Sequence, residues 1–268
     1  MSLRHAAAAV LISALTALAA CGQKEMETRT PPVIRPVPGL PASFGDRNPH
    51  GWDGRSPATY PVHGTDVARF QGRIYWDRAA AAGLRFAWIK ATEGGDRVDP
   101  EFQANWSGAA KAGLVRGAYH FYYWCRPAAE QAAWFIANVP RARGALPPVL
   151  DMEWTPFSLT CTIRPPAEVV RREAKIFLDM LERHYGTRPV IYSTPDFFER
   201  NGMDQLGAYD FWLRSTANHP SRTYPGHRWT FWQYTGTGLV PGFYTDVDLN
   251  AFNGTRAEFD RWLSQRQQ

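Results

Sequence analysis

From residue 62 onward, short apolar runs alternate with amphipathic segments along the chain. The runs have the length of strands, and most segments between them carry apolar positions three and four residues apart, which is the period of a helix. The clearest helix is expected over residues 167–185, where one apolar stripe ends at Gly186. This alternation predicts an α/β fold built on a parallel sheet.

Eight strands are expected, at residues 62–70, 84–94, 114–124, 146–154, 188–194, 211–217, 229–235 and 246–252. A helix is expected after each of the first five, at residues 76–83, 100–113, 128–139, 167–185 and 197–205, and a closing helix at 255–266. Little helix separates the last three strands. The pattern predicts an irregular TIM-like barrel, with five β/α units followed by three strands with little helix.

The beginning of the chain lacks this alternation. Residues 1–21 resemble a lipoprotein signal, in which a basic start and an apolar stretch too short to span a bilayer lead to a lipobox ending at Cys21. Lipidation of Cys21 would anchor the chain to a membrane, and an ordinary signal peptide with a spare thiol is the alternative. Residues 22–61 hold eight prolines and predict an extended tether. The catalytic barrel is then expected over residues 62–268.

The segment LPPVLDMEW, residues 146–154, is an apolar run that ends with two acids, Asp151 and Glu153. Residues i and i+2 of a strand point to the same face, with Cα atoms about 6.6 Å apart. Carboxyl groups held this close repel, so the pKa of one should rise, and the pair would then contain a proton donor and an anion. A strand ending in solvated acids, or an ion pair with an arginine, is the structural alternative.

Other polar residues lie in or at the ends of the proposed strands. Because the chemistry of such barrels sits where strands end, several are expected to meet at one mouth. They are Asp66, Glu93, His120 and Tyr192. For Glu93, a structural role and a place in the cleft are equally good interpretations.

Several common chemistries are excluded by their motifs. The chain contains no G-x-S-x-G, H-E-x-x-H, P-loop or G-x-G-x-x-G sequence. Residues 246–250 resemble the start of an EF-hand loop, but Ala251 and Ala257 occupy positions that require Gly and Glu. The seven histidines are scattered. We therefore expect no metal and no cofactor.

Composition narrows the chemistry further. Aromatic residues make up 14% of the chain, a surplus often found in sugar-binding clefts. The net charge of +5 suits contact with an anionic polymer, but no basic block is interleaved with aromatics, so no nucleic-acid partner is expected. Acids amid aromatics in an exported protein fit glycoside hydrolysis. That reaction needs one carboxylic acid to protonate the leaving oxygen and anions to stabilise an oxocarbenium-like centre.

Two cysteines follow neighbouring strands. Cys125 follows the third predicted strand and Cys161 the fourth, so both should lie at the same mouth of the barrel. Export favours disulfides, and the count is even once Cys21 is lipidated. We expect a bridge that closes the loop after the acid pair, and two buried free thiols are the alternative.

A series of motifs in order is similar to glycoside hydrolase family 25, the N-acetylmuramidase lysozymes that cut peptidoglycan. The motifs cover about residues 62–254 and read GTDVARFQGRIYWDRAAAAGLRFAWIKATEG, FQANWSGAAKAGLVRGAYHFY, LPPVLDMEW, VIYST, WTFWQYTGTG and DVDLNAF. The resemblance implies a barrel of five β/α units plus three strands. It also implies hydrolysis of the β-1,4 bond between N-acetylmuramic acid and N-acetylglucosamine. A non-catalytic peptidoglycan-binding module, or a hydrolase of another N-acetylhexosamine polymer such as chitin, are the alternatives.

The resemblance further implies roles at matching positions. Glu153 would be the general acid, and Asp151 its partner, which orients or stabilises the 2-acetamido group. Asp66 and Asp248 would complete an acidic floor, with a structural role as the alternative. The sugar cleft would be shaped by Tyr119, His120, Tyr192, Trp232 and Gln233, of which Tyr119 and Trp232 could instead be core aromatics.

Two positions depart from the pattern of the family. Ala68 stands where Ser is usual, and Phe70 where a Trp is expected nearby, and neither change removes a proton-transfer group. The lipobox at Cys21, the tether and the cysteine pair are not family-wide features. They point to a membrane-anchored lipoprotein that faces the periplasm, on the outer membrane if the cell is Gram-negative. A monomer is expected. It would act on peptidoglycan of its own wall or of a competitor's.

Overall fold

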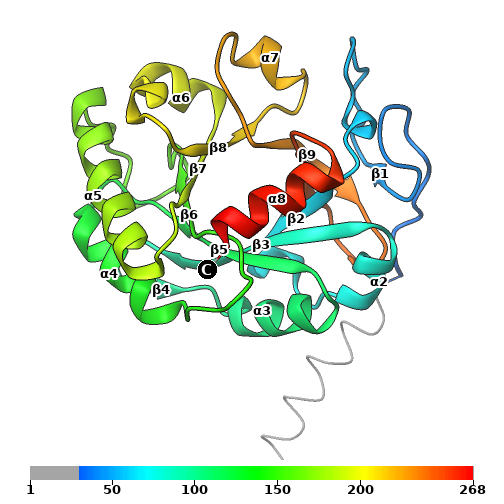
Figure 1. The fold of residues 1–268 in the computed structure, drawn as a ribbon, viewed down its shortest axis with the longest axis horizontal. Helices are drawn as coiled ribbons and strands as arrows, with labels where there is room; N and C mark the ends of the chain where they lie inside the picture. The colour runs from blue at the N-terminus through cyan, green and yellow to red at the C-terminus, as the bar shows by residue number, and fades with distance from the viewer. Residues whose placement is uncertain (1–29, 268) are drawn as a thin grey trace, which may run out of the picture.

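Eight strands close into a barrel at the centre of the molecule (Figure 1). The structure is a computed structural model that describes residues 30–267. The barrel strands are β2 (His63–Val67), β3 (Leu84–Glu93), β5 (Val115–Phe121), β6 (Val149–Met152), β7 (Val190–Ser193), β8 (Asp210–Arg214), β9 (Phe231–Leu239) and β10 (Val247–Phe252). Their order is β9-β10-β2-β3-β5-β6-β7-β8, and β8 pairs back with β9, which confirms the predicted closed barrel.

One strand departs from the predicted parallel sheet. Neighbouring strands from β2 to β9 pair in parallel, but β10 is antiparallel to both β9 and β2. A parallel neighbour needs a crossover connection of a dozen or more residues, whereas a short loop returns the chain antiparallel. Only residues 240–246 connect β9 to β10, so the prediction was wrong for this strand.

Helices cover the outside of the barrel after each of its first five strands, as predicted (Figure 1). They are α2 (Trp76–Ala81), α3 (Phe102–Lys111), α4 (Ala128–Asn138), α5 (Ala167–Tyr185) and α6 (Pro195–Asn201), and the last is followed by the 3-10 turn η3 (Met203–Leu206). Helix α5 has the predicted bounds, and its apolar stripe is buried. Smaller elements are η1 (Pro57–Thr59), η2 (Arg69–Gln71), β4 (Arg97–Val98) and the four-residue α7 (Pro220–Thr223).

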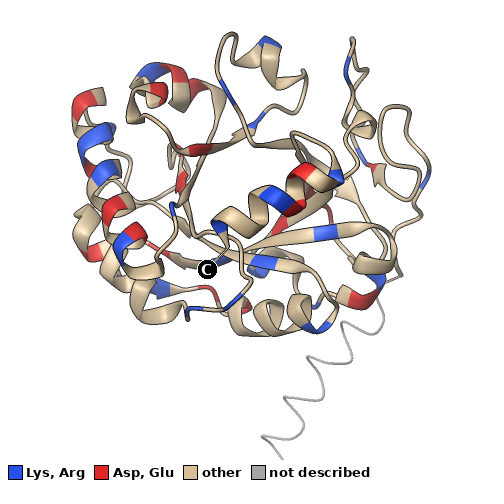
Figure 2. Cartoon of the chain, in the orientation of Figure 1, with Lys and Arg blue, Asp and Glu red and all other residues tan. Residues whose placement is uncertain are grey.

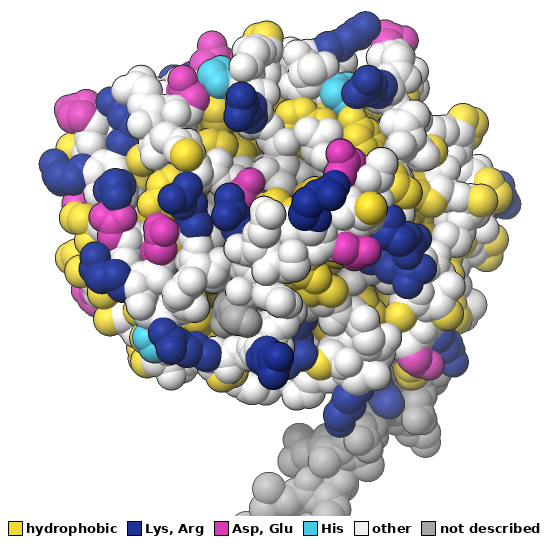
Figure 3. All heavy atoms as spheres, in the orientation of Figure 1, with side chains coloured by type: hydrophobic (Ala, Val, Ile, Leu, Met, Phe, Trp, Pro, Cys, Tyr) yellow, Lys and Arg dark blue, Asp and Glu magenta, His cyan; other side chains and the backbone are white. Residues whose placement is uncertain are grey.

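Aromatic rings fill the interior of the barrel at one of its two ends. Trp88 and Trp212 stack with their centroids 4.6 Å apart, and Phe231 meets Trp88 edge to face. Helix α8 (Arg256–Arg266) crosses this end of the barrel and packs Phe259 and Trp262 against the same cluster (Figure 1). Basic side chains, with acidic ones among them, lie over and around α8 on the face seen in Figure 3. This end is closed, so the other end is the open mouth.

Charged residues lie mainly on the helices and loops, and the barrel strands carry few of them (Figure 2). The exceptions inside the barrel are therefore informative, because a buried charge is costly unless it is paired or functional. Within residues 30–267, no helix is both long and apolar enough to cross a bilayer.

Residues 30–61, the described part of the segment before the barrel, differ from the extended tether expected over residues 22–61. Phe44 and Tyr60 are buried, and β1 (Gly45–Asp46) pairs antiparallel with the end of β9. Arg47 forms an ion pair with Asp246 in the β9–β10 loop. Large apolar residues recur among the prolines, and their burial on the outer face of the barrel outweighs the extended preference of the segment. The expected signal segment and Cys21 lie outside the described residues.

Candidate active site

The open end of the barrel gathers four carboxyl groups in a pocket of about 280 Å³. Asp151 lies in β6, and Glu153 follows it two residues later, so both point inward as predicted. Asp66 of β2 is the direct cross-strand partner of Asp248 of β10. The i, i+2 spacing and the β2–β10 register thus place four acids in one small space.

Two amide side chains hold Asp66. Gln233 Nε2 donates to both carboxylate oxygens of Asp66 at 3.1 and 3.2 Å, and Asn250 Nδ2 donates at 2.8 Å. The amide oxygens are themselves occupied, since Tyr192 Oη donates to Gln233 Oε1 at 2.8 Å and Trp212 Nε1 donates to Asn250 Oδ1 at 2.7 Å. Both NH₂ groups must therefore face Asp66, which favours its anionic form.

The Asp151–Glu153 pair holds a proton near neutral pH. Burial raises the pKa of Glu153 to about 7, and the positive charge of Arg214 acts against this rise. Burial and the charge of Glu153 raise the pKa of Asp151 well above its usual value, against the positive charge of Lys90. Two neighbouring carboxyl groups, one buried and one partly buried, cannot both ionise freely, so the pair can supply a proton.

Burial also raises the pKa values of both acids in the Asp66–Asp248 pair, but only Asp66 is held by amide hydrogen bonds. Burial raises the pKa of Asp66 to about 6, although the hydrogen bonds from Asn250 and Gln233 lower it. Burial and the charge of Asp66 raise the pKa of Asp248 well above its usual value. Asp66, which accepts three amide hydrogen bonds, is the anion of this pair at neutral pH.

Three of the five predicted cleft residues line the pocket: Tyr119, Tyr192 and Gln233. His120 and Trp232 do not, and their predicted places in the cleft were wrong. His120 is fully buried on the outer face of β5, bonded to Thr92 and Gln131. Trp232 is fully buried outside β9, where its Nε1 donates to the Ser215 carbonyl.

The physical reason is the two-residue period of a strand. Neighbouring residues point to opposite faces, so Tyr119 and His120 could not both face the cleft, nor could Trp232 and Gln233. Tyr119 and Gln233 point into the barrel, and their neighbours pack between the strands and the outer layer. The alternation of inward and outward residues along each strand would have shown that only one residue of each pair can face the cleft.

The pocket also contains residues whose place in it was not predicted from the sequence. Lys90 and Arg214 add two positive charges, and Phe121, Trp212 and the rim residue Phe70 add apolar surface. Lys90 follows the inward-facing Trp88 by two residues, so alternation along β3 was the available signal. Lys90 Nζ donates to Glu93 and lies 4.8 Å from the Phe121 ring centroid. Glu93 itself lies outside this pocket.

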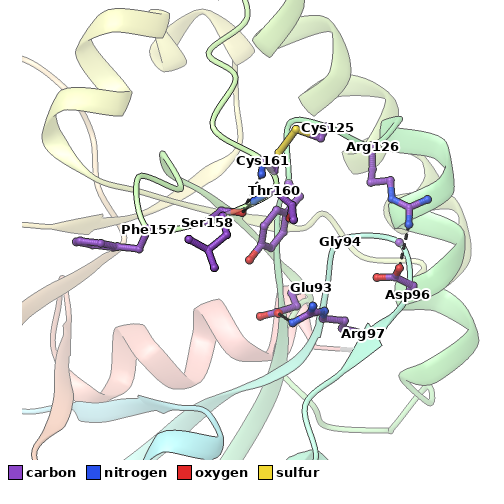
Figure 4. A pocket seen from close by; sticks show the side chains of 13 residues that line it. Glu93, Gly94, Asp96, Arg97, Cys125, Arg126, Phe157, Ser158, Thr160 and Cys161 are labelled. Atoms are coloured by element: carbon purple, nitrogen blue, oxygen red, sulfur yellow. Dashed lines mark hydrogen bonds and ion pairs between the residues drawn. A yellow bond between two sulfur atoms is a disulfide. The ribbon is translucent and has the colours of Figure 1, made fainter.

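The expected disulfide is present between Cys125 and Cys161, with Cα atoms 5.7 Å apart (Figure 4). It ties the end of β5 to the loop that follows the acid pair. Among residues 30–267, no group of three or more His, Cys, Asp and Glu side chains is arranged to hold a metal ion.

A set of four carboxyl groups at the open end of an α/β barrel, in a pocket lined by tyrosines and apolar rings, has the chemistry of a glycoside hydrolase. Comparison with known proteins agrees. Residues 65–243 match the sequence profile of "Glycosyl hydrolases family 25". The chain therefore belongs to this family and is a glycoside hydrolase.

Individual relatives cover most of the chain. Lysozyme M1 of Streptomyces globisporus is 37% identical in an alignment of 217 positions that covers 74% of this chain and 70% of the relative. The uncharacterized protein YegX of Escherichia coli strain K12 is 37% identical over 216 residues, 78% of this chain and 76% of the relative. A family 25 glycosyl hydrolase from Bacillus anthracis has a similar structure, with a TM-score of 0.72 and 36% identity over 81% of this chain and 98% of its own.

Proposed function

We propose that this glycoside hydrolase is a lysozyme that cuts the β-1,4 bond between N-acetylmuramic acid and N-acetylglucosamine in peptidoglycan. The observation that carries the proposal is the pocket that gathers four carboxyl groups, with Asp66 and Asp151 buried and Glu153 and Asp248 partly buried. The family assignment and the similarity to a lysozyme support the choice of polymer.

Glu153 is the general acid of the proposed reaction. Its pKa of about 7 keeps a substantial protonated fraction at neutral pH, and it lies at the mouth, where a glycosidic oxygen can approach. Proton transfer from Glu153 to that oxygen breaks the bond between the oxygen and the anomeric carbon. The nearby Arg214 favours the anion that remains.

Asp151 positions the 2-acetamido group of the sugar. Its Oδ1 is buried and has no hydrogen-bond partner among the described residues, so it can accept the N–H of that group. The acetamido oxygen then attacks the anomeric carbon as the bond to the leaving oxygen breaks. Water opens the resulting ring and returns a proton to Glu153, with net retention of configuration. NMR of the first product would show the β-anomer, and an α-anomer would contradict this route.

Asp66 and Asp248 form the floor of the pocket. The amide hydrogen bonds keep Asp66 ionised, which places negative charge near the developing oxocarbenium-like centre. Tyr192 acts through Gln233, because its hydroxyl fixes the direction of the amide that holds Asp66.

The test is digestion of defined glycans by purified protein, followed by mass spectrometry of the products. Peptidoglycan should yield fragments with N-acetylmuramic acid at the new reducing end. Cleavage of chitin but not of peptidoglycan would identify another N-acetylhexosamine polymer as the substrate. Binding without cleavage of either polymer would indicate a binding module.

We also propose that Cys21 is lipidated and that the barrel acts outside the cytoplasm. The lipobox-like sequence before Cys21 and the disulfide between Cys125 and Cys161 support this placement. Full-length protein should be found in the membrane fraction of the cell. Cys21→Ser should release it from that fraction, and an unchanged distribution would contradict the anchor.

A further inference from the structure

The proposed reaction does not use a second pocket, of about 580 Å³, whose lining is shown in Figure 4. Three segments form its walls. They are residues 93–97, from the last residue of β3 to the first of β4, residues 123–126 after β5, and residues 157–161 in the loop after β6. All three follow the carboxyl ends of barrel strands, so this pocket opens at the same end of the barrel as the carboxylates.

The two pockets are adjacent. Lys90 lines the catalytic pocket, and its ammonium group donates a hydrogen bond to Glu93, which lines the second pocket. Phe121 of the catalytic pocket contacts Tyr123 of the second pocket, with ring centroids 5.6 Å apart. A polymer bound at the carboxylates therefore has the second pocket within reach of its substituents.

The second pocket contains both signs of charge. Arg126 bridges Asp96 at 2.9 Å and Glu130 at 2.8 Å. Arg97 is held only loosely, with Nη1 3.6 Å from Glu93 Oε1, and its side chain is 72% exposed. Arg97 can therefore donate to a ligand carboxylate without breaking a close ion pair, while Asp96 can accept from a ligand amine.

The outer wall of the pocket is apolar and covalently fixed. Phe157 is 96% exposed and Leu159 is 100% exposed, on a loop closed by the bridge between Cys125 and Cys161. Large apolar side chains presented to solvent on a restrained loop are typical of a contact surface. The restraint lowers the entropy lost when a ligand orders the loop.

We infer that the second pocket binds the peptide that peptidoglycan carries on its muramic acid residues. This inference rests on the proposed function and names a further part of the same substrate. In intact strands the lactyl carboxyl of each muramic acid is bonded to the stem as an amide, so the sugar backbone offers no charge to the guanidinium and carboxylate groups of this pocket. The peptide stem, in contrast, has carboxylates, an amine in many cells, and methyl side chains. A five-residue stem spans up to about 16 Å, at about 3.3 Å per residue, which is enough to cross from one pocket to its neighbour.

The experiment compares two substrates with the same glycan backbone. One is soluble peptidoglycan strands with stems intact. The other is the same strands after an amidase has removed the stems and the exposed lactyl carboxylates have been converted to methyl amides, so that no new charge is introduced. Arg97→Ala should lower the ratio of kcat/KM on stem-bearing strands to kcat/KM on stripped strands about five- to tenfold, through KM. Phe157→Ser should lower the same ratio. Arg172→Ala is the matched control, because Arg172 is similarly exposed at 62% and pairs with Glu173 on α5, outside both pockets.

Equal losses on both substrates would overturn the inference, since they would indicate a glycan subsite or a damaged fold. An unchanged ratio in both variants would overturn it as well. Failure of the proposed function looks different, because the wild type would then cleave neither substrate. Binding of Glu153→Gln to the two kinds of strand provides a readout without turnover, and equal affinity for both would also contradict a stem-binding pocket.

Discussion

Asp66 and Asp248 are direct partners across the antiparallel strands β2 and β10 and share one amide-lined pocket floor. Like charges directly opposite each other in a sheet destabilise it, and burial adds to the effect. Both pKa values are raised by burial, to about 6 for Asp66 and well above the usual range for Asp248. The folded protein therefore binds protons that the unfolded chain releases.

This arrangement predicts a stability that falls as pH rises. An acid whose pKa is raised by folding stabilises the folded state when it is protonated. This contribution to the free energy of unfolding is fully present below the unfolded pKa of about 4, and it is lost as the pH rises through the folded pKa. Asp248→Asn removes one such group. Thermal unfolding should show the variant more stable than wild type by about 1–3 kcal/mol at pH 7, and nearly equal at pH 4. A variant less stable at pH 7 would contradict the repulsion.

Glu153→Gln tests the general acid. The amide cannot donate the proton, so kcat on peptidoglycan should fall at least about 100-fold. Thermal unfolding should show that the fold is retained, because the change is nearly isosteric. Glu168→Gln, at an exposed position in the first turn of α5, is the control and should leave the rate unchanged. If the Glu153→Gln enzyme kept full activity, Glu153 could not be the general acid.

The pH dependence of kcat/KM should be bell-shaped with its maximum near pH 6–7. The rate falls above pH of about 7 because Glu153 loses its proton, and falls below about 6 because Asp66 gains one. Lys90 lowers the pKa of Glu153, so Lys90→Met should move the alkaline limb to higher pH. A limb that stays in place would show that another group controls it.

The disulfide should contribute to stability. Cys125 and Cys161 are 36 residues apart, and a closed loop of this size contributes about 4 kcal/mol in the chain-entropy model. The double variant Cys125→Ser and Cys161→Ser should therefore have a lower Tm. Dithiothreitol should lower the Tm of wild type and leave that of the double variant unchanged, and a wild type insensitive to full reduction would contradict the prediction.

Adjacent residues of β9 should behave differently. Trp232 packs against Trp52 outside the barrel, with ring centroids 5.2 Å apart, so Trp232→Phe should lower the free energy of unfolding by about 1–3 kcal/mol with little change in KM. Gln233 donates to Asp66 inside the barrel, so Gln233→Leu should raise the pKa of Asp66 and move the acid limb upward. Together the two variants test whether Trp232 faces outward and Gln233 faces the pocket. A shift of the acid limb in Trp232→Phe, or none in Gln233→Leu, would contradict these orientations.

Much of the architecture was predictable because it follows from local periodicity. Apolar runs of strand length, helical stripes and glycine stops are properties of short windows, and they predicted eight strands and the bounds of α5. The packed segment around Phe44 and Tyr60 was not predictable in this way. Its composition favours an extended chain, and only the surface of a folded barrel offers its apolar residues a place to bury.

For the site, the sequence by itself determined which acids are available and that Asp151 and Glu153 share a face, because a strand repeats every two residues. Only the tertiary structure decided the rest. The antiparallel entry of β10 places Asp248 opposite Asp66, and barrel closure brings Lys90 and Arg214 beside them. These neighbours come from strands distant in sequence, and their charges and burial depend on distances that exist only once the barrel has closed.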